Sequence, residues 1–246
     1  MAHNEKLFLP IWLKYYSRYF DSNDIYVINH DSTDGSIQKA QEDYRFNLVD
    51  VHTNTIYDNN FMRNTVQDFQ HNLLKKYKVV AYSDTDELLI IDPDLGIDLG
   101  EYIDNYNGLL GCNTRSVVEQ SHELPYDSDI PVLKQRSVWF EEYLYNKVLV
   151  SKTPLYWSKG LHALQDKDGV PYTVPIDENL ILLHLARLDL SERLKRNKEN
   201  IKETWGGEND DAKQQRLSTK ELKYWFYNPV NLGYIGIIPE RFKELV

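Results

Sequence analysis

The chain has 246 residues and a formal net charge of -10 at pH 7, and this length favours a single α/β domain around one sizeable core, with a helical tail. The negative charge would repel a polyanion, so we expect no nucleic-acid partner. Without a run of roughly 18 apolar residues or an apolar signal-peptide core, we expect a cytoplasmic protein with no transmembrane segment.

The spacing of apolar residues in the first third of the chain predicts helices and strands in alternation. In chain order we predict a helix over 7–20, a strand over 24–29, a polar turn over 30–35, a helix from about 36 to 44, a strand over 46–51, a helix over 61–77 and a strand over 78–83. This alternation favours a doubly wound, mostly parallel central sheet flanked by helices. Ligands of such sheets bind beyond the carboxyl ends of the strands, so the loops 29–35 and 83–87 should be neighbours.

Beyond residue 88 the apolar pattern is less regular and is compatible with strands that pair in both directions. We predict strands over 108–115, 132–139, 146–150 and 180–186, helices over 190–202 and 218–226, and an exposed loop over 205–211. We therefore divide the chain into a catalytic domain over 1–188 and a helical C-terminal extension over 189–246 that packs on the same domain. Within the catalytic domain, the nucleotide-binding part would reach about residue 100 and the acceptor part would cover 101–188.

Two carboxylates follow the strand predicted over 78–83. Asp84 and Asp86 lie two residues apart, so both should point to the same side, with Glu87 next to them. Close carboxylates repel each other unless they share a proton or a cation. The single cysteine, Cys112, excludes a cysteine-built zinc site, whereas Mg²⁺ or Mn²⁺ binds one or two carboxylates together with phosphate oxygens. The tripeptide therefore predicts a divalent cation site; the alternative is a solvated acidic turn, because D-x-D tripeptides are common.

Several motifs occur in a characteristic order along the chain. They are Asn4-Glu5 before an aromatic-rich helix, the strand and turn over 25–35, Arg63-Asn64, the segment 82–88, Tyr145-Asn146-Lys147, His162, Leu182-Leu183-His184 and Ser191-Glu192-Arg193. In this order they resemble the motifs of family 2 type glycosyltransferases with the GT-A fold, in the branch that carries D-x-D-E-[FL]. The resemblance covers about residues 4 to 200 and is strongest up to Leu88.

The resemblance implies a GT-A type, Rossmann-like fold and a metal-dependent, hexosyltransferase-like activity of the kind used in polysaccharide biosynthesis. The donor would be a UDP- or GDP-sugar, the acceptor a saccharide or other hydroxyl compound, and the transfer would invert the anomeric carbon. Two departures from the family pattern leave the base open, namely Asn29 in place of the usual Asp and Asp31 in place of Gly. The family also has a strand before its N-E motif, so here a first strand is missing or an unusual start replaces it.

The donor-binding residues that follow from this resemblance come from four places in the chain. The nucleoside would be bound by Asn29, Asp31, Ser32 and Asp34, and the phosphates by Arg63 and Lys147. For Ser32 and Asp34, a turn that caps the next helix is an equally good interpretation. For Arg63 and Lys147, the alternative to phosphate binding is that each is an ordinary exposed side chain, Arg63 on a helix and Lys147 on a strand.

The metal ligand and the catalytic base are also carried over from the resemblance. Asp86 would bind the metal ion, and Asp84 would contact the ribose or donor sugar, with a metal-ligand role as its second candidate function. Either His162 or His184 would complete the metal shell, although His184 also fits a core histidine. The acceptor base would be Glu141 or Glu142, with Glu119 and Glu123 as rivals, and each of the four also fits a surface carboxylate.

Two other functions fit parts of the pattern. A nucleotidyltransferase also uses carboxylates and Mg²⁺ on a doubly wound sheet, but it commonly needs a Gly-rich basic loop after its first strand, which this sequence lacks. A catalytically inactive GT-A-fold protein that binds a carbohydrate or nucleotide is the second alternative, and Asn29 and the short start of the chain favour it.

Overall fold

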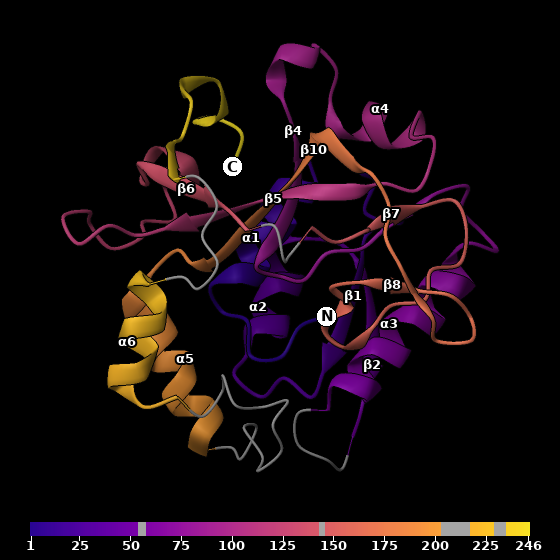
Figure 1. Cartoon of the computed structure of the whole chain (residues 1–246). Coiled ribbons are helices and arrows are strands. Elements are labelled where there is room, and N and C mark those ends of the chain that lie inside the picture. Colours follow the sequence, from indigo (N-terminus) through magenta and orange to yellow (C-terminus); the bar gives the residue numbers. More distant parts are fainter. Residues whose placement is uncertain (54–57, 143–145, 203–216, 229–234) are drawn as a thin grey trace.

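A five-stranded mixed sheet forms the centre of the computed structural model, which describes residues 1–53, 58–142, 146–202, 217–228 and 235–246 (Figure 1). The strand order is β11 (Ile235–Ile237), β6 (Val138–Glu141), β5 (Gly111–Val118), β10 (Ile176–Arg187) and β4 (Glu87–Ile91). β10 pairs in parallel with β5, and the other three pairings are antiparallel. The α/β class is confirmed, but the prediction of a mostly parallel sheet is wrong for this sheet. Its described connections lack the repeated crossover helices that successive parallel strands need.

A parallel pair precedes this sheet in the chain. β1 (Tyr26–His30) and β2 (Asn47–Val51) are joined by α2 (Ser36–Asp43), which is the crossover unit that the sequence predicts. Ala2 forms a parallel bridge with Asn29 on β1: its N–H donates to the Ile28 carbonyl at 2.8 Å, and its carbonyl accepts from the His30 N–H at 2.8 Å. This bridge brings the start of the chain beside β1.

The remaining short strands form two-stranded ladders. β3 (Val80–Ala81) pairs antiparallel with β7 (Val150–Ser151), and β8 (Leu164–Gln165) pairs antiparallel with β9 (Pro171–Tyr172). The strands predicted over 78–83 and 146–150 therefore shrink to two residues each. The strand predicted over 132–139 is a 3-10 turn over Val132–Lys134 followed by β6.

Besides α2, further helices surround the strands, and four of them lie where the sequence predicts them. These are α1 (Phe8–Tyr16), α3 (Asn59–Leu73), α5 (Leu190–Lys202) and α6 (Thr219–Tyr227), whereas the short helix α4 (Leu99–Asp104) was not predicted. The Asp58 carboxylate caps α3 by accepting from the Asn60 N–H at 2.8 Å, and Ser218 caps α6 in a capping box with Glu221. α5 and α6 lie side by side, at the lower left of Figure 1. The loop predicted over 205–211 lies outside the described residues.

The main core includes two neighbouring apolar strands, β4 at one end of the five-stranded sheet and β10 beside it. Leu88 to Ile90 of β4 and Leu180 to Leu183 of β10 are buried, since both faces of these strands are covered. Ile238 and Phe242 join the same core, and Phe226 of α6 packs against β5 and β6. Among the described residues, no helix is both long and apolar enough to cross a membrane.

Candidate active site

A pocket of about 240 Å³ lies where β3 ends and β4 begins, and several predicted site residues line it. These are Arg63 of α3, Asp84, Asp86, Lys147, His162 and His184. Residues 84–86 form a turn between β3 and β4, in which the Glu87 N–H donates to the Asp84 carbonyl at 3.0 Å; the two aspartates are half-buried and Thr85 between them is buried. The acidic tripeptide therefore faces a cavity and is not a solvated surface turn.

The pairing of β4 with β10 brings a histidine from far along the chain to this tripeptide. In the antiparallel register His184 lies opposite Glu87, and the Leu185 N–H donates to the Asp86 carbonyl at 2.7 Å. His184 Nε2 consequently lies 3.9 Å from Asp86 Oδ2. Since two ligands that each lie about 2.1 Å from one small cation can be up to about 4 Å apart, this pair fits a shared divalent ion.

Asp84 is held by groups of the protein itself. Its Oδ1 accepts from the Tyr82 hydroxyl at 2.5 Å, and its Oδ2 lies 3.5 Å from the Lys147 ammonium. Burial opposes ionisation of Asp84, but Lys147, the N-terminal ammonium and Tyr82 together lower its pKa to about 2. Asp84 is therefore ionised and already occupied, which leaves Asp86 as the better direct ligand of a cation.

Lys147 is a buried cation that balances this acidic wall. Its Nζ donates to Glu87 Oε1 at 2.6 Å, and both side chains are buried. Burial opposes the charge on Lys147, yet Glu87 and Asp84 raise its pKa above the usual value. Lys147 thus stays charged inside the pocket, where a phosphate could approach it.

Glu142 lies behind His184 instead of facing the pocket. Its Oε2 lies 3.4 Å from His184 Nδ1 and accepts from Ser116 Oγ, and its Oε1 accepts from Arg187 at 2.7 Å. Burial opposes the charge, but His184, Ser116 and Arg187 lower the pKa of Glu142 to about 2. A carboxylate on one ring nitrogen, with the other nitrogen directed at a carboxylate cluster, is typical of metal-binding histidines. The geometry favours Glu142 as a positioning residue over its predicted role as catalytic base.

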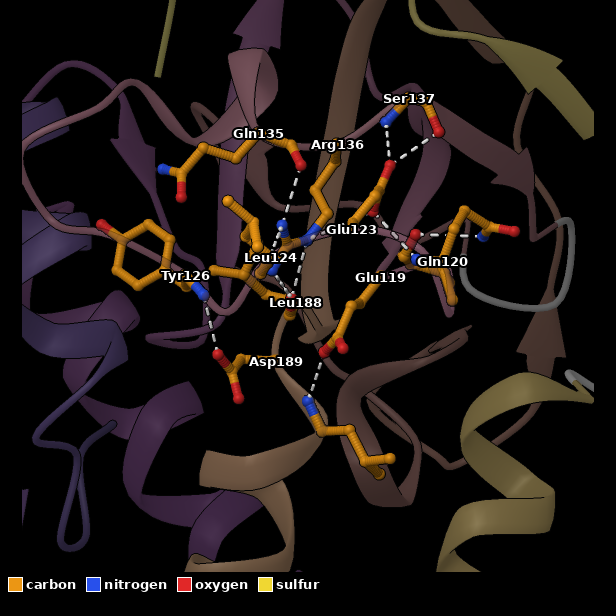
Figure 2. A network of polar contacts seen from close by, with 12 residues as sticks. Glu119, Gln120, Glu123, Leu124, Tyr126, Gln135, Arg136, Ser137, Leu188 and Asp189 are labelled. Carbon is orange, nitrogen blue, oxygen red and sulfur yellow. Dashed lines mark hydrogen bonds and ion pairs between the residues drawn. The ribbon is translucent and has the colours of Figure 1, made fainter.

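The other predicted bases do not line the pocket. Glu141 pairs with Arg115 at 2.9 Å. Figure 2 shows Glu119 and Glu123 in a network beside the start of α5, where Glu119 accepts from the Leu190 N–H at 2.7 Å and Glu123 accepts from the Ser137 N–H at 2.7 Å. Their carboxylates stabilise backbone segments, so the structure does not support any of them as the acceptor base.

The two candidate histidines differ in their surroundings. His162 lines the pocket after Gly160, whose φ of 72° places it in the left-handed region, and burial together with nearby Lys147 lowers the pKa of His162 to about 4. Burial would also lower the pKa of His184, but Glu142 and Asp86 raise it, so a metal ion would have to displace its proton. The contact with Asp86 favours His184 as the ligand.

The predicted nucleoside loop is satisfied by its own neighbourhood. Asn29 donates to Asp50 at 2.7 Å, and Asp31 Oδ1 lies 2.6 Å from His52 Nδ1. Ser32 accepts from the Asn4 N–H at 3.2 Å, and Asp34 accepts from the Ser36 N–H at 2.9 Å. Asp31 adopts a φ of 50°, the left-handed conformation for which the family pattern has Gly and which Asp tolerates. None of the four predicted side chains lines the pocket.

A metal ion would need ligands beyond the protein at this site. Within the described ranges, no group of three or more His, Cys, Asp or Glu could hold a metal ion by itself. Mg²⁺ and Mn²⁺ commonly bind one or two protein ligands and take their other ligands from substrate phosphates and water. Asp86 and His184 fit that mode of binding.

The comparisons with known proteins do not show a family. No protein-family model matches this chain, and no curated protein matches it. The resemblance to glycosyltransferases therefore rests on the order of the motifs and on the chemistry of the pocket.

Sequence reasoning missed a second wall of the pocket. Glu5 of the N-E motif, Arg193 and Arg196 of α5, and Trp225 of α6 all line it. The motif Ser191-Glu192-Arg193 pointed to α5, but nothing local in the sequence indicated which of its residues faces the pocket. Trp225 follows a long stretch of chain after α5, and only the packing of α6 beside α5 brings it here.

Proposed function

We propose that this protein is a glycosyltransferase of the family 2 type with a GT-A fold, which transfers a sugar from a nucleotide-sugar to a saccharide or other hydroxyl acceptor. The observation that supports it most is the 3.9 Å approach of His184 to Asp86 in a pocket that also holds the buried cation Lys147. The order of the motifs along the chain is the second support.

Different residues of the pocket would bind the metal ion, orient its histidine ligand and bind the phosphates of the donor. Asp86 and His184 would hold a divalent cation, which when bound would neutralise charge on the leaving nucleoside diphosphate. Glu142 keeps His184 oriented through Nδ1. Lys147 supplies a fixed positive charge that is already desolvated, so it needs no rearrangement when a phosphate arrives.

Arg63 and Asp84 complete this view of the donor site. The Arg63 guanidinium donates to Asn64 Oδ1 at 2.9 Å and lines the pocket, so it can turn from this exposed partner to a phosphate. Asp84 is positioned by Tyr82 and Lys147 to accept from a hydroxyl of the ribose or donor sugar.

The experiment that tests this function measures ligand binding and then turnover. A nucleoside diphosphate at about 100 times its Kd should raise the Tm by about 5–10 °C, and we expect this for UDP or GDP with Mn²⁺. Asp86→Ala should abolish the shift, whereas Asp68→Ala, which removes an exposed carboxylate of α3, should leave it unchanged. No shift with either nucleotide would contradict the proposal.

A second measurement separates an enzyme from a binding protein. Release of UDP or GDP from a panel of nucleotide-sugars should depend on Mn²⁺ or Mg²⁺ and should fall by about 1,000-fold in Asp86→Ala, the loss expected when several kcal/mol of charge stabilisation disappear. Metal-dependent binding without release of nucleotide, in the presence of saccharide acceptors, would instead indicate a catalytically inactive GT-A-fold protein.

A further inference from the structure

The wall of the pocket formed by α5 carries two arginines one helical turn apart. Arg193 and Arg196 are both half-buried and both line the pocket. Arg196 forms an ion pair with Glu5 Oε1, and Glu5 is only 5% exposed. The pair is incomplete, because Glu5 Oε2 and Arg196 Nε are buried without a hydrogen-bond partner in the described part of the chain. Buried polar atoms of this kind are usually satisfied, so a ligand or water is expected to reach them.

Arg193 has no acidic side chain bound to it among the described residues. Its guanidinium carbon lies 5.3 Å from the centre of the Trp225 ring, and Arg187 lies 4.3 Å from the same ring. Burial and the neighbouring Arg196 lower the pKa of Arg193 to about 10. A cation in such surroundings is costly unless an anion joins it.

The start of α5 is firmly supported, so these arginines do not depend on a loose helix. Figure 2 shows Arg136 and Asp189 in this support. Arg136 is buried and donates to the Leu188 carbonyl at 2.9 and 2.6 Å, and Asp189 caps α5 by accepting from the Glu192 N–H at 3.0 Å. Arg193 follows directly in the first turn. A site held by capped and buried groups is organised before its ligand binds.

The pocket brings together side chains of opposite charge. Asp86 and Arg193 both line it, so a carboxylate and a guanidinium share one cavity. A ligand that suits both side chains has one anionic group for the arginine and another that reaches the carboxylate through a cation. A diphosphate has these two groups, whereas a single carboxylate has only one.

We propose that Arg193, supported by the Arg196–Glu5 pair, binds a phosphate of a diphosphate directly, so that the pocket recognises diphosphates even without a metal ion. Arginine suits this task because its planar guanidinium can donate two parallel hydrogen bonds to phosphate. The inference deepens the proposed function and rests on it for the complete ligand, a nucleoside diphosphate. The anion subsite itself can be tested with inorganic pyrophosphate.

The experiment is a calorimetric titration of the full chain with pyrophosphate in EDTA. We expect measurable binding by the wild type and a loss of affinity of about 10- to 100-fold in Arg193→Gln, the effect of removing charge-assisted hydrogen bonds. Lys195→Gln is the matched control, since it removes the same charge from α5 at a side chain that is 57% exposed and paired with Glu192. It should change the affinity less than about twofold.

Arg193→Lys keeps the charge but loses the planar fork, so its affinity should lie between those of the wild type and Arg193→Gln. Circular dichroism checks that each variant is folded. If Arg193→Gln does not fold, the test uses Arg193→Lys instead, and a pyrophosphate affinity of Arg193→Lys equal to that of the wild type would overturn the proposal. Equal losses in Arg193→Gln and Lys195→Gln, or no pyrophosphate binding by the wild type in EDTA, would also overturn it.

Asp86→Ala separates this inference from the proposed function. It should keep metal-free pyrophosphate binding and lose the gain in affinity that Mn²⁺ provides. Intact pyrophosphate binding without any metal-dependent release of nucleotide from nucleotide-sugars contradicts the proposed function and leaves the anion subsite standing. If Arg193→Gln releases nucleotide as fast as the wild type and binds pyrophosphate with unchanged affinity, the anion subsite is contradicted and the proposed function is not.

Discussion

The acidic turn 84–87 lies between β3 and β4, and the polar loop 29–34 begins at the end of β1, yet the polar side chains of the two segments find their partners in different ways. The loop satisfies itself: Asn29, Asp31 and Asp34 bond to Asp50, His52 and Ser36, all within about two dozen residues along the chain. The acidic turn depends on distant partners, since Lys147 and His184 come from other elements.

This difference separates a turn that needs no ligand from a site that is prepared for one. Local hydrogen bonds stabilise a loop at little cost, and they leave few acceptors for a nucleoside. Charges gathered from distant elements in a pocket are costly to bury, and such clusters are frequent at functional sites. The following variants test how far the two regions differ, from the largest expected effect to the smallest.

Lys147→Met should have the largest effect on stability. It leaves the buried Glu87 carboxylate without its partner, which should lower the free energy of unfolding by about 3–5 kcal/mol. Chemical denaturation of the variant measures this loss. The double variant Lys147→Met with Glu87→Gln should recover part of it, because no unpaired charge then remains buried. A loss of less than about 1 kcal/mol in the single variant would show that the pair is hydrated.

The pH dependence of the free energy of unfolding tests how strongly burial disfavours the charged form of Glu5. Burial raises the pKa of Glu5 from 4.5 to about 7, even though Arg196 lowers it. The folded protein therefore binds this proton more tightly than the unfolded chain does, so the contribution of Glu5 to the free energy of unfolding is largest below pH 4.5 and falls as the pH rises towards 7.

Glu5→Gln should remove this part of the pH dependence. Relative to the wild type, the variant should gain about 3 kcal/mol between pH 4.5 and pH 8, measured by chemical denaturation across that range. Parallel curves for the two proteins would mean that Glu5 titrates as it does in water.

Glu142→Gln tests whether the carboxylate behind His184 orients it for a metal ion. We expect the affinity for Mn²⁺, measured by titration calorimetry with UDP or GDP present, to fall by about 10- to 100-fold, as for other carboxylates that support a metal-binding histidine. Glu141→Gln changes the neighbouring carboxylate, which pairs with Arg115, and should leave this affinity unchanged. Equal effects of the two variants would contradict the positioning role.

Asp31→Ala should have the smallest effect on ligand binding. Because Asp31 bonds to His52 and does not line the pocket, the affinity for UDP or GDP should change by less than about twofold. A tenfold loss, with folding intact, would show that the loop opens to bind the nucleoside and would restore the role that the resemblance implies for it.

Much of the local structure was predictable. The sequence predicted α1, α2, α3, α5 and α6 to within a few residues, because the apolar face of a helix repeats every three to four residues and can be recognised from residues close together in the chain. Asp84 and Asp86 line one pocket, but they lie in a turn before β4 and not on the strand whose alternation was expected to align them. β11 was missed because it has only three residues. β4 (Glu87–Ile91) was missed because the regular apolar pattern in the sequence ends at Leu88, the second residue of this strand.

The sequence by itself thus determined where most of the helices and several strands lie and which tripeptide carries two carboxylates, since each of these depends on residues close together in the chain. Only the tertiary structure decided the direction of strand pairing, the preference for His184 over His162 and the presence of Arg193 in the same pocket as Asp86. These depend on the register of β4 against β10 and on the packing of α5 and α6. Contacts between distant segments are selected by the burial of the whole core, which no short stretch of sequence encodes.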